Sequence, residues 1–216
     1  MTSPKIATQE QWLEARMKLY AKEKDLLDVR DSVSAERREL PWVRMDKEYV
    51  FQSTEGEVTL LDLFDGRRQL IVYHFMLPSM TGGEFCRSCS FWVDNIGHLA
   101  HFHARDTTVV LDCPVPLESI VEFKERMGWS IPWYSSLGTD FYTDLFISRE
   151  SGTMMPGISV FIREGDSVYH TYSTLEFGGE MLNGTNHYLD LTPLGRQEEG
   201  LAWKHDWVRY HDAYEA

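Results

Sequence analysis

The sequence has few cysteines and no long apolar run. Only three cysteines occur in 216 residues, and an odd number in a chain of this length does not suit a disulfide-stapled scaffold. No stretch of about 18 consecutive apolar residues is present, so we expect no transmembrane helix. Residues 1–5 lead into a charged segment without an apolar core. We therefore expect no signal peptide and a cytoplasmic, reducing location.

Basic residues are also scarce. Lys and Arg number 21 against 34 Asp and Glu, which gives a net charge of −13. Binding to nucleic acid or to an anionic membrane surface needs clustered cations, so neither partner is expected. In contrast, 43% of the residues are hydrophobic and 13% are aromatic, with seven Trp. This composition and length predict a globular protein with one good core and some appendages.

One stretch organises the chain. Residues 70–76 are apolar, β-branched and aromatic, which is typical of a strand buried on both faces. A loop with Pro78, Gly82 and Gly83 follows, and then Cys86-Arg87-Ser88-Cys89 opens a predicted helix that extends to about residue 103. A strand, a loop, a Cys-x-x-Cys and a helix in this order indicate a redox motif.

The spacing gives each cysteine a role. A helix N-terminus carries partial positive charge, which stabilises a thiolate, the nucleophile of disulfide exchange. We therefore predict that Cys86 attacks and that Cys89, three residues later on the same helix face, resolves the mixed disulfide. The positive charge of Arg87 should favour the Cys86 thiolate. The alternatives are two inert buried cysteines, or a structural zinc site, which normally needs four ligands.

The order of predicted elements indicates an α/β fold. Strands at 70–76 and 107–111 are each followed by a helix, so they should pair in parallel, and residues 156–162 and 168–172 should form an antiparallel hairpin. This is the thioredoxin arrangement, a central mixed sheet flanked by helices. In that arrangement a proline before the hairpin faces the cysteines, often after a cis peptide bond, and Pro156 is the candidate. An ordinary turn proline is the alternative, because most X-Pro bonds are trans.

We expect three regions: an N-terminal helical extension (residues 1–40), a thioredoxin-like domain (41–195) and a C-terminal tail (196–216). Thr8 and Gln11 match a capping box, so a helix should start there and run to about residue 38, with a break near Asp31 and Ser32. This charged helix either packs on its own domain or serves as an arm that forms a homodimer, and the sequence does not decide between the two.

Several stretches resemble a known family, the thioredoxin-like domain-of-unknown-function 899 family. The matching segments, which together span nearly the whole chain, are residues 36–42, 62–66, 69–76, 89–92, 126–129, 170–173 and 188–193. The resemblance implies a thioredoxin-like fold and leaves the biochemical activity largely open. Two positions depart from the family pattern: Arg87 replaces a proline between the cysteines, and Cys113 stands where serine is expected. Residues around the cysteines tune the redox potential of such a pair.

A metal site is the alternative use of the cysteines. His74 lies in the central strand and His170 in the hairpin, and either could join Cys86 and Cys89 in a soft ligand set for copper or zinc. Cys113 ends the neighbouring strand and could be a third thiol. His101 lies twelve residues after Cys89, roughly 18 Å along a straight helix, which is too far to share the metal unless the helix breaks at Gly97.

The function that we favour from the sequence is thiol–disulfide oxidoreduction, or a peroxidase-like variant, with Cys86 and Cys89 as the catalytic residues. Its substrate would be a small-molecule or protein thiol or disulfide, and the chemistry requires no cofactor. Neither Arg105 nor Arg126 can be placed near a peroxide from sequence. The aromatic residues 129–141 are expected to line a substrate pocket or to pack in the core.

Overall fold

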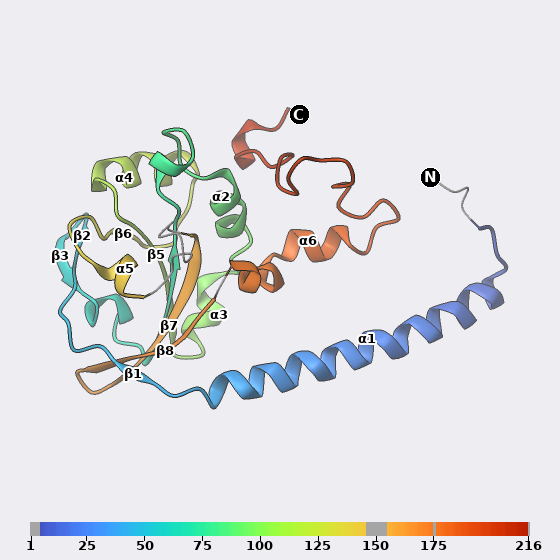
Figure 1. Ribbon diagram of the computed structural model, residues 1–216, viewed down its shortest axis with the longest axis horizontal. Helices are drawn as coiled ribbons and strands as arrows, with labels where there is room; N and C mark the ends of the chain where they lie inside the picture. The colour runs from blue at the N-terminus through green and yellow to red at the C-terminus, as the bar shows by residue number, and fades with distance from the viewer. Residues whose placement is uncertain (1–4, 146–154, 175, 216) are drawn as a thin grey trace. The chain divides into compact units, whose positions relative to one another are not determined.

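The computed structural model describes residues 5–145, 155–174 and 176–215. The chain forms two compact units, Met1–Pro41 and Trp42–Ala216. The first unit contains a single helix of 30 residues, α1 (Gln9–Arg38), which is blue in Figure 1.

The capping box of α1 is confirmed. The Gln11 N–H donates to the Thr8 hydroxyl, and the Thr8 N–H donates to the Gln11 side chain. These two bonds satisfy donors that every helix N-terminus leaves free. The predicted break near Asp31 and Ser32 is wrong, since α1 is continuous to Arg38.

The second unit is built on one mixed sheet of eight strands among the described residues, in the order β1-β8-β7-β4-β5-β6-β2-β3. The strands are β1 (Val43–Arg44), β2 (Val50–Ser53), β3 (Gly56–Thr59), β4 (Gln69–His74), β5 (Thr107–Cys113), β6 (Trp133–Ser135), β7 (Gly157–Glu164) and β8 (Ser167–Ser173). β4 pairs with β5 in parallel and with β7 antiparallel, and β7 and β8 form the predicted hairpin. β4 is therefore a central strand, with β5 on one side and β7 on the other.

Helices cover both faces of this sheet (Figure 1). They are α2 (Arg87–Asp94), α3 (Leu99–His103), α4 (Leu117–Arg126), α5 (Phe141–Asp144) and α6 (Gly184–Leu189), with short 3-10 helices η1 (Asp62–Phe64), η2 (Pro78–Met80), η3 (Glu176–Leu182) and η4 (His211–Ala213). Side chains alternate along β4. Tyr73 and Phe75 pack in one core with residues of α2 and α4, and Leu70 and Val72 pack in the other with η1 and α5.

This topology is the thioredoxin-like fold predicted from the sequence. The Cys-x-x-Cys helix α2 follows the central parallel strand β4, and the antiparallel hairpin β7–β8 completes the sheet on its other side. A site at the carboxyl end of a central strand is the usual place for function in open α/β sheets. None of the helices in the described part of the chain has the length and hydropathy needed to cross a bilayer.

The predicted single helix from Cys86 to about residue 103 is wrong. α2 ends at Asp94 and α3 starts at Leu99. The Asn95 amide donates to the Phe91 carbonyl at 2.7 Å, while its oxygen accepts from the Thr185 N–H and hydroxyl. Asn95 thus ties the end of α2 to a distant segment, as short polar side chains do when they compete with helical hydrogen bonds.

Candidate functional site

Cys86 is the N-cap residue of α2. Its backbone is extended (φ −64°, ψ 118°), and its Sγ accepts a hydrogen bond from the Cys89 N–H at 3.3 Å. Cys86 is 7% exposed, whereas Cys89 is fully buried. Both thiols are free. The first turn of α2 therefore presents one accessible sulfur and keeps the other behind it.

The two thiols differ in acidity. The side-chain hydrogen bond from Cys89, the backbone amides of Cys89 and Ser88, and the charge of Arg87 together lower the pKa of Cys86 to about 7, although burial opposes the shift. Burial raises the pKa of Cys89, and its interaction with Cys86 adds to the rise. A nucleophilic thiolate in front of a protonated thiol is the asymmetry that disulfide exchange uses.

Tyr73 approaches the inner thiol from the sheet. Its hydroxyl interacts with the Cys89 thiol, and this interaction lowers the pKa of Cys89 while it raises that of Tyr73. The Tyr73 hydroxyl is buried and has no oxygen or nitrogen partner among the described residues. The Met76 N–H also lies 3.5 Å from the Cys89 sulfur. Both groups would stabilise a negative charge on Cys89 when it forms.

The low pKa of Cys86 predicts a measurable pH profile. Alkylation of Cys86 by iodoacetamide should be slow below pH 7, where the thiol is protonated, and should reach its plateau above it, with a midpoint near pH 7. Peptide mass spectrometry after timed quenching would give the rate at each pH. A midpoint at the ordinary thiol value of about 8.5 would contradict the geometry.

Two residues serve as controls for this profile. Arg87→Glu replaces a favourable charge with an unfavourable one, so the midpoint should move to higher pH. Cys113 should stay unmodified across the neutral range, because burial and the charge of Asp112 raise its pKa.

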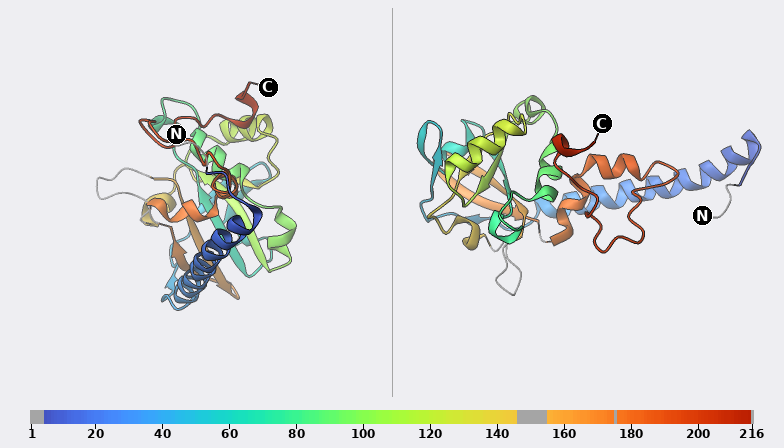
Figure 2. Two further views of the ribbon diagram at one scale, coloured as in Figure 1. Left: turned by 90° about the vertical axis from the view of Figure 1, so that its right-hand side faces the viewer. Right: turned by 90° about the horizontal axis from the view of Figure 1, so that it is seen from above.

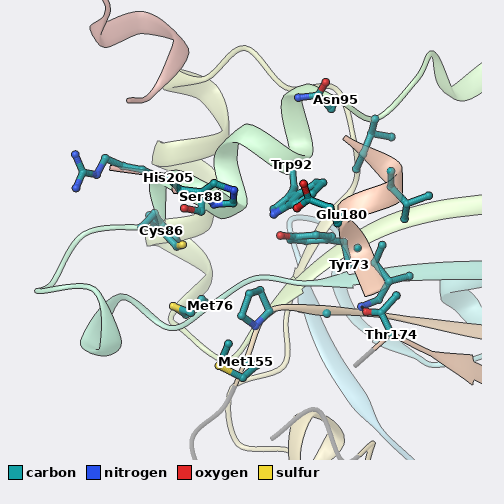
Figure 3. Close-up of a pocket in the computed structure, with 18 of the residues that line it drawn as sticks. Tyr73, Met76, Cys86, Ser88, Trp92, Asn95, Met155, Thr174, Glu180 and His205 are labelled. Carbon is teal, nitrogen blue, oxygen red and sulfur yellow. Dashed lines mark hydrogen bonds between the residues drawn. The ribbon is translucent and has the colours of Figure 1, made fainter. Parts of the chain in front are cut away.

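A cavity of about 670 Å³ opens next to Cys86. Most of its lining is apolar, and it includes Ile71, Tyr73, Met76, Phe85, Trp92, Met155, Pro156, Ile158, Leu182 and Trp203. Figure 3 shows the rings of Tyr73 and Trp92 side by side on one wall, and the sulfur atoms of Cys86, Met76 and Met155 along another. The Cys86 thiol therefore borders a largely apolar cavity.

The C-terminal segment contributes to this cavity, which the sequence analysis missed. Trp203, His205, Asp206 and Tyr210 are among the lining residues. The Tyr210 hydroxyl donates to the carbonyl of Phe85, the residue before the first cysteine. The aromatic residues in this otherwise polar tail could have indicated that it packs against the domain, because large aromatic side chains are usually buried at least in part.

Two further contacts hold this segment in place. The Arg126 guanidinium forms a bidentate pair with Asp212 at 2.8 and 3.0 Å, and His211 Nδ1 lies 2.9 Å from the Asp94 carboxylate. The red C-terminal segment accordingly lies beside α2 in Figures 1 and 2, and the Arg126–Asp212 pair joins it to the end of α4. The Arg126 guanidinium is thus engaged in an ion pair with the C-terminal segment.

The other sequence candidates lie in different places. Pro156 lines the cavity, and its peptide bond is trans, since no cis bond occurs among the described residues. Cys113 is fully buried in the same apolar core as Cys86 and Cys89, but it does not line the cavity. Within the described ranges, no group of three or more His, Cys, Asp or Glu side chains could hold a metal ion.

His74 and His170 belong to a separate buried chain of polar side chains. His74 Nδ1 lies 2.6 Å from Asp112 Oδ1, and its Nε2 lies 2.9 Å from the Ser159 hydroxyl. The Ser159 hydroxyl is 2.8 Å from that of Ser173, which is 2.8 Å from His170 Nε2. The two histidines are therefore linked to each other through Ser159 and Ser173. None of these hydrogen bonds involves Cys86 or Cys89.

This network of side chains joins Asp112, His74 and Ser159 in the order of a hydrolase triad, but the serine has no access to a substrate. Ser159, His74 and Asp112 are all fully buried, and the rings of Phe141 and Tyr142 pack on His74. The array is therefore a structural element of the core.

Of the two alternatives for residues 129–141, a pocket wall or core packing, the first does not hold for the cavity at Cys86, because none of these residues lines it. Trp129 and Trp133 instead pack around Phe75, at ring-centroid distances of 6.4 and 4.8 Å. Phe141 packs against Phe51 on the other face of the sheet.

Comparison with solved structures finds proteins of similar chain trace. A thiol:disulfide interchange protein from Bacteroides sp. is 14% identical, with a TM-score of 0.47, and the match covers 71% of this chain and 93% of that one. The mitochondrial 2-Cys peroxiredoxin from Plasmodium falciparum is 12% identical, with a TM-score of 0.44, and the match covers 69% of this chain and 92% of that one. A search of curated proteins gave no match.

One family model matches almost the entire chain. Its description reads "Bacterial protein of unknown function (DUF899)", and the match covers residues 1–214. This agrees with the resemblance seen in the sequence motifs. The chain is a member of the DUF899 family.

Proposed function

We propose that this protein is a dithiol oxidoreductase in which Cys86 attacks an oxidised substrate and Cys89 resolves the intermediate. The observation that carries the proposal is the asymmetry of the pair. Cys86 is accessible from the cavity and has a pKa lowered to about 7, while Cys89 is fully buried and has a raised pKa. Because only the thiolate attacks, this arrangement gives one nucleophile and one reserve thiol.

The reaction with a disulfide proceeds in two balanced steps. The Cys86 thiolate attacks one substrate sulfur, the substrate S–S bond breaks, and the released thiolate takes up a proton. Cys89 then loses its proton and attacks the Cys86 sulfur, which releases the second substrate thiol and forms the Cys86–Cys89 disulfide. Two electrons pass from the protein to the substrate. The Tyr73 hydroxyl and the Met76 N–H support the charge on Cys89 in the second step.

A peroxidase-like variant uses the same pair. The Cys86 thiolate would attack a peroxide oxygen, the O–O bond would break, and the departing alkoxide or hydroxide would take up a proton, which leaves a sulfenic acid on Cys86. Cys89 would then attack that sulfur, form the disulfide and release water. An external thiol reductant must regenerate the dithiol in either case.

The test is a redox titration of the purified, chelator-treated full chain. Thiols would be trapped with an alkylating reagent at each poised potential, and the Cys86 and Cys89 peptides would be quantified by mass. We expect one two-electron transition, in which both thiols disappear together, at a potential between about −120 and −270 mV.

Cys113 supplies the internal control of the titration, since its fully buried thiol should titrate with neither partner. Two outcomes would overturn the proposal. The first is that Cys86 and Cys89 never form a disulfide. The second is that they become protected only when copper or zinc is added, which would indicate metal binding instead.

A further inference from the structure

We propose that the substrate of this site is a small apolar molecule with a reducible disulfide or hydroperoxide bond, and not a protein disulfide. This inference rests on the proposed dithiol function and specifies its substrate class. The observation behind it is the position of Cys86 at the wall of a largely apolar cavity of about 670 Å³.

The size and lining of the cavity favour a small organic molecule. Pockets of about 300–1,000 Å³ with mostly apolar walls are typical small-molecule sites. Tyr73, Trp92 and Ile158 give the cavity flat and branched apolar surfaces, and Met76 and Met155 add flexible ones. Methionine adapts to ligands of different shape, so the site is suited to a hydrophobic substituent beside the reacting bond.

The charges at the cavity disfavour an anionic substrate. Glu84, Glu180 and Asp206 line it, against the single guanidinium of Arg87. Arg196 pairs with Glu180, which leaves two carboxylates facing one cation. An anionic disulfide such as oxidised glutathione would therefore meet like charges on entry.

The C-terminal segment limits access from outside. Cys86 is only 7% exposed, and Tyr210 is bonded to the Phe85 carbonyl directly before it. Arg126 and Asp212 fasten the same segment to α4. The segment therefore covers this sulfur on one side, so a disulfide on the surface of a folded protein has less access to it than a small molecule inside the cavity.

The chemistry balances for both kinds of apolar substrate. With a disulfide RSSR, the two thiols give two RSH and the Cys86–Cys89 disulfide. With a hydroperoxide ROOH, Cys86 takes the terminal oxygen and releases ROH, and Cys89 then displaces water to form the same disulfide. In each case two electrons leave the dithiol and reduce one S–S or O–O bond.

The experiment compares two matched pairs of oxidants on the reduced full chain. Cumene hydroperoxide is paired with hydrogen peroxide, and 2,2′-dithiodipyridine with oxidised glutathione, so that the substituent differs while the kind of reacting bond stays the same. The rate of Cys86–Cys89 disulfide formation is measured by quenching and mass, with dithiothreitol as the free-dithiol reference. We expect the apolar-to-polar rate ratio to exceed that of dithiothreitol by about tenfold or more in at least one pair. The pair that shows the preference identifies the reacting bond.

A cavity-filling variant tests whether the preference comes from this space. Ile158→Phe adds bulk to the wall of the cavity, so it should slow the preferred apolar oxidant at least about fivefold and change the polar oxidant less than about twofold. Ile162→Phe is the matched control, because Ile162 lies on the same strand and the same face but does not line the cavity. It should leave both rates unchanged.

The outcomes separate this inference from the proposed function. If the dithiol titrates normally but its rate ratios equal those of dithiothreitol, or if insulin disulfides react faster than the apolar small molecules, the substrate class is wrong and the dithiol function stands. If no Cys86–Cys89 disulfide forms under any oxidant, the proposed function itself fails.

Discussion

Replacing Cys86 with serine is expected to lower the rate of substrate reduction by about three orders of magnitude or more, because a serine hydroxyl does not ionise near neutral pH and the thiolate is the attacking group. Cys86 is the thiol that lines the cavity and the one whose pKa is lowered to about 7. The measurement is steady-state turnover with the preferred oxidant and an excess of dithiothreitol as reductant, corrected for the uncatalysed reaction.

Cys89→Ser should fail at a different step. Cys86 is still able to attack, so a disulfide substrate should remain attached as a stable mixed disulfide in a one-to-one ratio, visible as a mass increase of one substrate half. Cys89 attacks the mixed disulfide from a fully buried position. A thiol from solution cannot easily take that position, so it should not resolve the mixed disulfide efficiently. A Cys89→Ser protein that turns over at the rate of the unmodified chain would remove Cys89 from the mechanism.

Cys113→Ser is the matched control for both variants. Cys113 belongs to the same core as the other two cysteines but does not line the cavity, and burial together with the charge of Asp112 raises its pKa. We expect its turnover to stay within about twofold of the unmodified chain, since the thiol takes no part in either step. Loss of turnover equal to that of Cys86→Ser would assign Cys113 a direct role.

Replacing His74 with alanine is expected to lower the free energy of unfolding by about 1–3 kcal/mol, the usual cost of leaving a buried polar group without its partner. His74 and Asp112 are both fully buried, and their side chains lie 2.6 Å apart. Without the imidazole, Asp112 keeps only the Ser136 hydroxyl, which donates to it at 2.9 Å.

Urea unfolding monitored by tryptophan fluorescence would measure this loss. His103→Ala is the control, since His103 is exposed at the end of α3 and its removal should change the free energy of unfolding by less than about 0.5 kcal/mol. In a double-mutant cycle, His74→Ala combined with Asp112→Ala should cost less than the sum of the single changes, because the second substitution removes the buried carboxyl group that the first leaves without its neighbour. A loss below about 1 kcal/mol in His74→Ala would show that the pair contributes little.

Local features of this chain could be predicted from sequence with good accuracy. The capping box at Thr8 and Gln11 involves residues three apart, and so does the hydrogen bond from the Cys89 N–H to the Cys86 sulfur. The buried runs at β4 and β5 and the hairpin β7–β8 follow from the apolar pattern and the turn residues. Together these features were sufficient to predict the thioredoxin-like fold, because a strand followed by a helix favours parallel pairing with the next strand.

The errors arose where a distant residue decided a local outcome. The helix after the cysteines ends at Asp94 because Asn95 bonds both to Phe91 and to Thr185, a residue 90 positions away. The aromatic residues 129–141 carry no pattern that distinguishes a pocket wall from a core. In the structure, Trp133 packs against Phe75 and Phe141 packs against Phe51.

The sequence by itself determined the local motif, namely two thiols three residues apart at the start of a helix that follows a buried strand. Only the tertiary structure decided what surrounds them. Strand pairing placed His74 opposite Asp112 and joined it to Ser159, away from the cysteines. Chain folding brought Tyr210 to Phe85, 125 residues away, and so placed the C-terminal segment in the wall of the cavity. Such contacts depend on the register of strands and the path of the whole chain, which no local pattern encodes.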